Sequence, residues 1–431
     1  MKDNFSSSIT ENLKPYILPK NWTWFFWEDI MQSYQQGMIR SNSQLGCGNV
    51  EYLKMGDIDS SGTADLSKLK RSEATSKEIL EYELKQGDFL INVRNSLSLV
   101  GKTCVIDELN HGKTLYNHML VRIDNGSVDM NYFINAFLNV PSSKKMLDRI
   151  KEGTTTVIAL YQRELNKLPI ALPDSVTFNS IVKFYKELRL KIDLNNKINA
   201  ELEAMAKLIY DYWFVQFDFP DENGKPYKTS GGRMVYNKEL NRDIPDGWES
   251  GELTDIANIT MGQSPPGNSY NEEGVGEVFY QGCTDFGGRF PTNRKFTTKP
   301  SRFAKKGDIL LSVRAPVGTM NVANEDCCIG RGLAALNSKD NCISYLDGVL
   351  QYMKQIFDRR NSSGTTFGSI TKGDLFSLSV VKPNEGILKR FDAIAKPMFD
   401  KQNIIGLENQ KLAELRDWLL PMLMNGQVRV K

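Results

Sequence analysis

The sequence predicts an α+β protein with two tandem globular domains, each followed by a long helix, and with the two helices packed as an antiparallel coiled coil. Three observations support this prediction. Stretches of the first half recur in the same order in the second half. Each half ends in a long heptad pattern, and strand-like runs with many turn signals precede each pattern.

The internal repeat is clearest in a ten-residue stretch. Lys85–Arg94 reads KQGDFLINVR and Lys305–Arg314 reads KKGDILLSVR, at an offset of 220 residues. Three further stretches match at offsets of 217, 211 and 210 residues: Val100-Gly101 with Val317-Gly318, Gly153–Thr155 with Gly364–Thr366, and Leu168–Pro173 with Leu378–Pro383. An offset that shrinks in steps is expected when loop insertions and deletions separate two copies of one fold. We therefore interpret the chain as a duplication.

Buried strands are expected inside each globule. Asp88–Arg94 and Asp308–Arg314 both begin at a Gly-Asp turn and are mainly apolar. Segment 217–247 is rich in turn residues and is expected to connect the two copies. The expected divisions are a first globule over 1–178, a long helix over 179–216, a linker over 217–247, a second globule over 248–384 and a second long helix over 385–425.

Each long helix is predicted from heptad spacing. Ten positions from Ile181 to Tyr212 match ten positions from Phe391 to Met422 at an offset of 210 residues, and seven of the ten are apolar in both copies. An ordinary helical core would show the same stripe, but the length and the matched register favour an intramolecular pair. The residues expected to pack the pair are Ile181, Leu188, Leu202, Met205, Ile209, Met398, Leu412, Leu415 and Leu419.

Three residues are expected to shape the second helix. Pro397 predicts a local kink or break, because proline lacks the amide hydrogen that continues a helix. Pro421 and Gly426 are expected to mark the end of the helix.

Composition sets broad limits on function. The 431 residues include 54 Lys and Arg and 52 Asp and Glu, a formal net charge of +2, which neither requires nor excludes a nucleic-acid partner. Hydrophobic residues at 40% and charged residues at 25% are typical of globular domains. No run reaches the ~20 apolar residues of a membrane span, and the first residues lack the apolar stretch of a secretory signal. We expect no membrane contact and a cytoplasmic location.

Cysteine and histidine usage argues against a metal site. The six cysteines show no Cys-x-x-Cys spacing, so free thiols in a reducing compartment are expected. The two histidines, His111 and His118, are expected to be surface or capped residues and not ligands. We expect no metal.

One window is strongly basic. Residues 286–306 contain seven cations and no acid, interleaved with four phenylalanines. Such a stretch could lie along phosphates, although a solvated loop beside a core would have the same composition. The cations are Arg289, Arg294, Lys295, Lys299, Arg302, Lys305 and Lys306.

Recognised catalytic motifs do not stand out. There is no Asn/Asp-Pro-Pro-aromatic tetrapeptide for adenine methylation and no Gly-x-x-x-x-Gly-Lys-Ser/Thr loop, and Gly330-Arg331-Gly332 is too short for a dinucleotide loop. Pro220-Asp221 lacks the Glu-x-Lys strand of a nuclease. A self-contained methyltransferase or nuclease therefore has no visible motif. A coiled-coil adaptor that never touches DNA is the other alternative.

Several stretches resemble the DNA specificity subunits of type I restriction–modification systems, over nearly the whole chain. They are Trp248 with Leu253–Ile259 and Gly262–Pro265, Gly307–Ser312, Gly364–Thr366 with Ile370 and Leu375, and Leu208–Pro220. The first copy departs from the family pattern, because Trp24–Ile30 stands where the opening should be and no Gly-x-Ser-Pro follows.

The resemblance implies a DNA reader without chemistry of its own. Each globule would read one half-site of double-stranded DNA, and the helices would hold the globules at a fixed separation. Two methyltransferase subunits would bind S-adenosylmethionine, and restriction subunits in the full complex would use ATP. This chain is therefore expected to bind no cofactor.

The expected DNA contacts combine the basic window, a polar loop and matched strand ends. They are Arg94, Gln263, Ser264, Thr284, Asp285, Arg289, Arg294, Lys295, Arg314 and Thr365. The alternative for Arg94 and Arg314 is a structural salt bridge. For Gln263 and Ser264 it is a plain turn without a DNA contact, and for Thr365 it is a helix cap. Trp213, Phe214 and Trp418 are expected either to dock the methyltransferase subunits or to pack between the helices.

Overall fold

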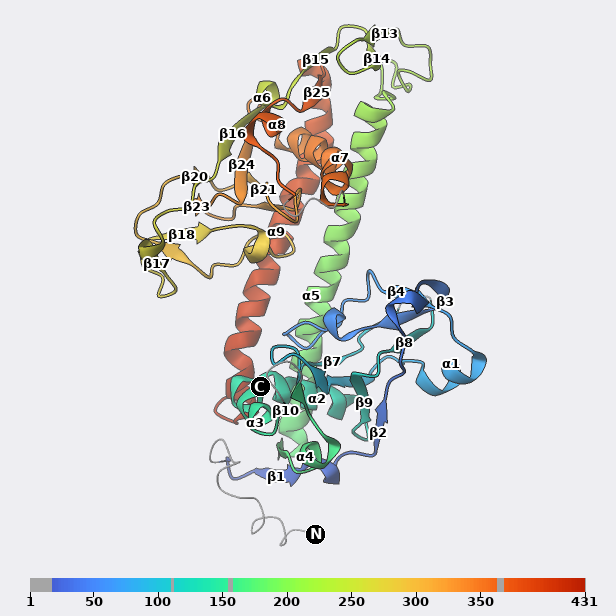
Figure 1. Ribbon diagram of the computed structural model, residues 1–431, viewed down its shortest axis with the longest axis vertical. Helices are drawn as coiled ribbons and strands as arrows, with labels where there is room; N and C mark the ends of the chain where they lie inside the picture. The colour runs from blue at the N-terminus through green and yellow to red at the C-terminus, as the bar shows by residue number, and fades with distance from the viewer. Residues whose placement is uncertain (1–17, 110–111, 154–157, 363–367, 431) are drawn as a thin grey trace. The chain divides into compact units, whose positions relative to one another are not determined.

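The computed structural model describes residues 18–109, 112–153, 158–362 and 368–430 of the chain (Figure 1). They form two compact units, unit 1 (Met1–Asp193 with Lys411–Lys431) and unit 2 (Leu194–Gln410). The two long helices, α5 (Ser175–Tyr210) and α9 (Glu385–Met424), each contribute one end to each unit. Unit 1 is therefore completed by the last turns of the chain.

Unit 1 is built on an antiparallel sheet in the order β2-β9-β5-β7, with strands Ser33–Gln36, Leu120–Asp124, Phe89–Asn92 and Thr103–Val105. A second sheet, β4-β3-β8, comprises Lys70–Ser72, Leu45–Leu53 and Thr114–Tyr116. Strand β1 (Trp22–Phe26) pairs with β12 (Pro169–Pro173), and β6 (Arg94–Asn95), β11 (Ile158–Ala159) and β10 (Glu152–Gly153) form a small sheet. The short helices are α1 (Ser76–Tyr82), α2 (Val128–Asn139), α3 (Pro141–Arg149) and α4 (Gln162–Asn166).

Unit 2 repeats this plan. The central sheet runs β16-β24-β21-β22, with strands Ala257–Met261, Leu333–Ser338, Ile309–Ser312 and Met320–Val322. The outer sheet runs β17-β19-β18-β23-β20, with strands Tyr270–Asn271, Phe296–Thr297, Glu277–Tyr280, Cys327–Ile329 and Phe303–Ala304. Two pairs complete the strands, β15 (Glu249–Glu252) with β25 (Ser379–Lys382) and β13 (Met234–Asn237) with β14 (Arg242–Pro245). The helices are α6 (Leu253–Ile256), α7 (Ile343–Ser362) and α8 (Lys372–Phe376).

Matched hydrogen bonds confirm the duplication. The Gly87 amide donates to the Ile106 carbonyl, and the Gly307 amide donates to the Ala323 carbonyl, each at 2.8 Å. Both glycines have positive φ angles, +88° and +93°, a conformation that glycine adopts without steric cost. The strands that follow, β5 and β21, are fully buried, as the sequence predicts.

Helix α5 spans Ser175–Tyr210 and α9 spans Glu385–Met424, where long helices are expected over 179–216 and 385–425. Helix α9 runs unbroken through Pro397, so the predicted break is wrong. It also continues past Pro421 to Met424 and ends before Gly426, whose φ is +71°. A buried face on both sides of each proline stabilises the helix enough to offset the missing amide hydrogen bond.

The buried stripe of each helix differs from the predicted heptad at alternate positions. In α5, the predicted residues that lie seven apart, starting from Ile181, are buried or half-buried; Leu188 and Leu202 are among them. Between them the inward residue lies one position later, so that Ala206 is half-buried while Met205 is 48% exposed. In α9 the same shift leaves Leu415 38% exposed, so the prediction that Met205 and Leu415 pack the helix pair is wrong.

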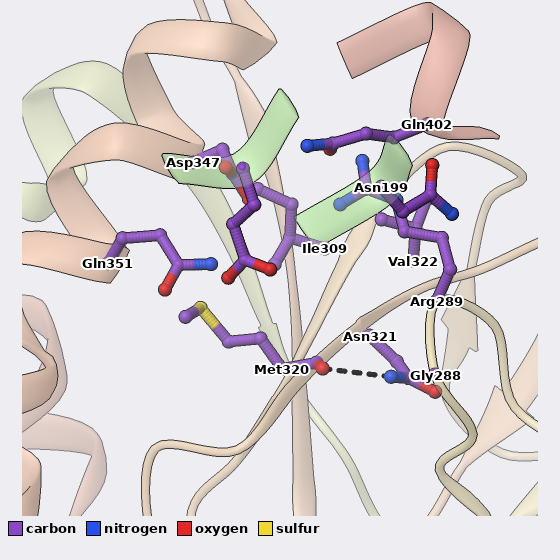
Figure 2. Close-up of a pocket in the computed structure, with 11 residues that line it drawn as sticks. Asn199, Gly288, Arg289, Ile309, Met320, Asn321, Val322, Asp347, Gln351 and Gln402 are labelled. Carbon is purple, nitrogen blue, oxygen red and sulfur yellow. Dashed lines mark hydrogen bonds between the residues drawn. The ribbon is translucent and has the colours of Figure 1, made fainter. Parts of the chain in front are cut away.

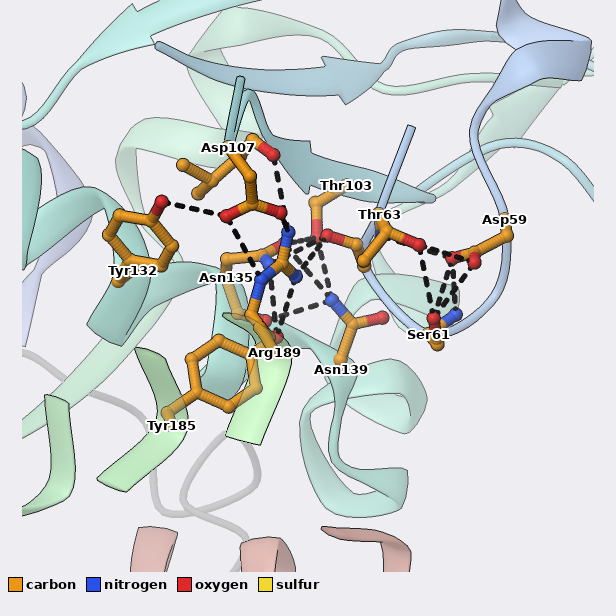
Figure 3. Close-up of polar contacts among 12 residues, drawn as sticks. Asp59, Ser61, Thr63, Thr103, Asp107, Tyr132, Asn135, Asn139, Tyr185 and Arg189 are labelled. Atoms are coloured by element: carbon orange, nitrogen blue, oxygen red, sulfur yellow. Dashed lines mark hydrogen bonds and ion pairs between the residues drawn. The ribbon is translucent and has the colours of Figure 1, made fainter. Parts of the chain in front are cut away.

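A buried arginine joins α5 to the globule of unit 1 (Figure 3). Arg189 donates through Nη1 to the Gly62 carbonyl at 2.7 Å and pairs through Nη2 with the Asp107 carboxylate. Tyr132 donates its hydroxyl to the same carboxylate at 2.7 Å. The Arg189 side chain is only 4% exposed, so the charge is compensated inside the protein.

Further sequence expectations concern thiols and membranes. All six cysteines are free, as expected. In the described part of the chain, no helix has the combination of length and apolar character needed to cross a membrane. Within the same residues, no three acidic, cysteine or histidine side chains gather as a metal site.

Candidate nucleic-acid interface

The basic window of unit 2 is mostly at the surface. Lys299, Arg302, Lys305 and Lys306 are exposed, and Phe303 beside them is 45% exposed. Lys305 pairs with Asp326 at 2.7 Å, so this cation is partly compensated within the chain. The window therefore presents a positive surface beside the outer sheet, although some of its charges already have partners.

Two predicted DNA contacts, Arg294 in this window and Asp285 just before it, are occupied with each other. Asp285 is buried, and its carboxylate accepts from Arg294 Nε at 2.7 Å. Thr284 is exposed, and its carbonyl accepts from Arg294 Nη2 at 3.3 Å. Asp285 therefore holds the loop that carries Thr284 and is itself buried, while Lys295 is half-buried.

Arg289 is turned toward α9 and away from solvent. Its Nε donates to Asn403 Oδ1 at 2.8 Å, and its guanidinium lies 4.4 Å from the centre of the Phe399 ring. It lines a pocket inside unit 2 together with Asp347, Glu203 and others (Figure 2). Burial raises the pKa of Asp347 to about 6. The pocket is part of the packing of unit 2, so its geometry gives Arg289 a structural role and no DNA contact.

The turn Gly330–Gly332 organises a polar surface on unit 2. The Gly330 amide donates to the Tyr280 carbonyl at 2.8 Å, and the Arg331 amide donates to Ser264 Oγ at 3.3 Å. The Gln263 amide donates to the Ile329 carbonyl at 3.0 Å. Gln263 and Arg331 are both exposed, so the turn brings the predicted loop and an additional arginine to one surface.

Arg314 stands beside this turn. Val313, the residue before it, donates its amide to the Gly332 carbonyl at 2.9 Å. Arg314 and its counterpart Arg94 are both exposed, and neither forms an ion pair with a residue that the structure describes. The salt-bridge alternative therefore has no partner in those residues, and both guanidinium groups are available to a ligand.

Unit 1 has the same turn at Asn117–Met119. The Asn117 amide donates to the Leu53 carbonyl at 2.9 Å, and the Val93 amide donates to the Met119 carbonyl at 2.9 Å. His118 occupies the central position that Arg331 has in unit 2. Burial and the nearby Arg94 guanidinium lower the pKa of His118 below its ordinary 6.5, so the ring is neutral at pH 7.

A glycine supports each of these turns. An added Cβ at Gly37 would lie 2.5 Å from the Asn117 carbonyl oxygen, and one at Gly262 would lie 2.2 Å from the Gly330 carbonyl oxygen. Only glycine fits such a close approach of backbone. Sequence reasoning dismissed His118 and missed Arg331. Extending the repeat from Gly37 and Gly262 to Leu120 and Leu333 would have found both.

Four predicted contact residues remain: Thr365, Trp213, Phe214 and Trp418. Thr365 lies outside the described residues. Trp213 and Phe214 are 4% and 1% exposed and belong to the core of unit 2, which supports the alternative of packing and contradicts an exposed docking role. Trp418 is 66% exposed.

Comparison with known proteins decides the family. The model of the type I restriction modification DNA specificity domain matches residues 19–204 and again residues 245–417. This chain belongs to that family. The two matched ranges correspond to the two copies of the repeat, so each copy is a member of the same domain family.

Relatives within the family cover nearly the full chain. A putative type I restriction enzyme MjaX specificity subunit from Methanocaldococcus jannaschii is 29% identical, over 96% of this chain and 95% of that protein. The HindI specificity subunit of Haemophilus influenzae is 21% identical, over 88% of this chain and 94% of that protein. A crystal structure of a type I S subunit from M. genitalium superposes with a TM-score of 0.56 at 15% identity, covering 95% of this chain and 98% of that one, which supports the fold.

Proposed function

We propose that this chain is the non-catalytic DNA sequence-recognition subunit of a type I restriction–modification complex. It reads a bipartite target with one half-site per unit. The observation that carries the proposal is the double match to the specificity domain, in a chain that folds as two units with equivalent exposed turns. Two short half-sites give useful specificity, because each correctly read base pair contributes about 1–3 kcal/mol of discrimination.

The proposed domain plan keeps the sequence-derived boundaries. The target-recognition domains span 1–178 and 248–384, the long conserved helices span 179–216 and 385–425, and 217–247 links the copies. The helices form an antiparallel coiled coil that fixes the separation of the half-sites. Within unit 2, support comes from Asn195, which donates to Glu408 and Asn409 across the helices at 2.8 Å.

Two methyltransferase subunits bind the outward faces of the helices, and restriction subunits join them in the full complex. Support comes from exposed apolar residues that stand 210 residues apart on the two helices: Leu194 with Ile404, Met205 with Leu415, and Leu208 with Trp418. Matched apolar positions suit two copies of one partner, since apolar and aromatic residues are enriched in interface cores. The complex is cytoplasmic, and S-adenosylmethionine and ATP bind its other subunits.

Co-expression with a type I modification subunit from the same organism tests the proposal. Genomic DNA is then sequenced for N6-methyladenine. We expect a gapped, two-part motif that appears only when this chain is present. A complex without motif-specific methylation would favour a structural adaptor, and methylation by this chain alone would establish an enzyme in its place.

A further inference from the structure

Each unit presents one turn at the same place in the repeated fold. The turns Asn117–Met119 and Gly330–Gly332 are held by corresponding backbone hydrogen bonds at 2.8–2.9 Å to Leu53 and Tyr280, respectively. Their last residues accept from Val93 and Val313 at 2.9 Å in both copies. Because the backbone fixes these turns, the side chain at the central position can vary without disturbing the fold.

The arginine beside each turn is the same in both copies. Arg94 follows Val93 and Arg314 follows Val313, and both side chains are exposed. A group that contacts the sugar–phosphate backbone carries no sequence information, so two domains that read different half-sites can share it. Arginine suits this role because its planar donors match phosphate oxygens.

The central residue of the turn differs between the copies. Arg331 is exposed and forms no ion pair with residues in the described ranges, so its donor fork is free. His118 is half-buried, and its Nδ1 is enclosed without a hydrogen-bond partner among the described atoms, which leaves Nε2 as the ring nitrogen for a ligand. A neutral imidazole offers one donor and one acceptor, whereas a guanidinium offers donors only.

We propose that Arg331 and His118 are sequence-determining residues for the two half-sites and that Arg314 and Arg94 are the phosphate-binding residues beside them. The inference rests on the proposed function, because it requires a DNA duplex on these surfaces. Arg331 reads a guanine through the O6 and N7 acceptors of the major groove. His118 contacts a base edge through Nε2 alone, because its Nδ1 is enclosed by the protein, so the two half-sites differ at this position.

The test uses the complex of this chain with its modification subunits and a library of random-sequence DNA duplexes. The wild type is compared with Arg331→Gln, Arg331→Lys, His118→Gln and Arg314→Gln. Arg233→Gln is the matched control, since the Arg233 side chain is 80% exposed and lies outside both turns. Unchanged melting temperatures and complex formation show that each variant is folded.

We expect the Arg331 variants to lose preference at one base pair of one half-site by about 5- to 150-fold, with the other half-site unchanged. Arg331→Lys keeps the charge but not the fork, so it loses this preference while retaining most of its affinity. His118→Gln changes one position of the other half-site. Arg314→Gln keeps the motif, weakens binding to all sequences alike and reduces the slope of log affinity against log salt by about 0.9.

The assignment is overturned if the Arg331 variants enrich the wild-type motif unchanged, or if Arg314→Gln alters a base preference. Failure of the proposed function gives a different result, since the wild-type complex itself would then enrich no sequence. If the wild type enriches a motif and all four variants enrich the same motif, the proposed function stands, but Arg331 and His118 do not determine the sequence that is bound.

Discussion

At the scale of single residues, Asp347 links the packing of unit 2 to pH. Its carboxyl lines the pocket with Glu203 and Arg289, and burial raises its pKa to about 6. A carboxyl whose folded-state pKa lies above its unfolded value contributes stability at low pH, and this contribution is lost as pH rises through about 6. At pH 7.5 the ionised group therefore destabilises the folded unit.

Asp347→Asn removes that charge and keeps the shape. We expect it to raise the free energy of unfolding at pH 7.5 by about 1–2 kcal/mol, because one pKa unit corresponds to about 1.4 kcal/mol and the pocket is partly solvated. The gain should shrink as pH falls from 6 to 4. Urea unfolding between pH 4 and 7.5 measures the change in the free energy of unfolding, with Asp400→Asn on the exposed face of α9 as control. An equal gain at pH 4.5 and 7.5 would contradict the assignment.

At the scale of elements, the corrected stripe of α5 makes a prediction about neighbouring residues. Ala206 lies in a groove with Phe391, Ala395 and Phe399 of α9, whereas Met205 is 48% exposed. We expect Ala206→Glu to destabilise unit 2 by about 2–4 kcal/mol, since a carboxylate there is partly desolvated and Lys207, the lysine that lines the groove, is already paired with Asp211. Met205→Glu should cost about 0.5 kcal/mol or less. Equal losses in denaturant titrations would restore the original heptad register.

Sequence patterns predicted the elements better than the faces they use. The duplicated Gly-Asp turns predicted β5 and β21, and the heptad spacing predicted both long helices, because these elements depend on local spacing. The heptad was ambiguous because apolar residues such as Met205 also stand on the outer face. Asp285 and Arg289 were misplaced for another reason. Their partners, Arg294 and Asn403, become neighbours only through tertiary packing, which composition does not reveal.

At the scale of the whole molecule, the chain closes unit 1 with its own C-terminal end. Leu420, Leu423 and Met424 of α9 lie in the core of unit 1 with residues such as Phe133, and Leu423 is 1% exposed. An added Cβ at Gly426 would lie 2.4 Å from Pro19 Cγ, so the residues that follow α9 pack closely against those that precede β1. The core of unit 1 therefore depends on the C-terminal turns of α9.

Leu423→Ala tests this dependence. We expect a loss of about 2–5 kcal/mol in unit 1, the usual cost of a buried cavity, with unit 2 unaffected. Hydrogen exchange reports on the two units separately. In Leu423→Ala, amide protection should fall in β5 and β9 of unit 1 and persist in β21 and β24 of unit 2. Leu346→Ala, at a residue 1% exposed in the core of unit 2, is the matched control and should give the reverse pattern. Parallel loss in both units from either variant would mean that they unfold as one body, and reading of the two half-sites would then be lost together.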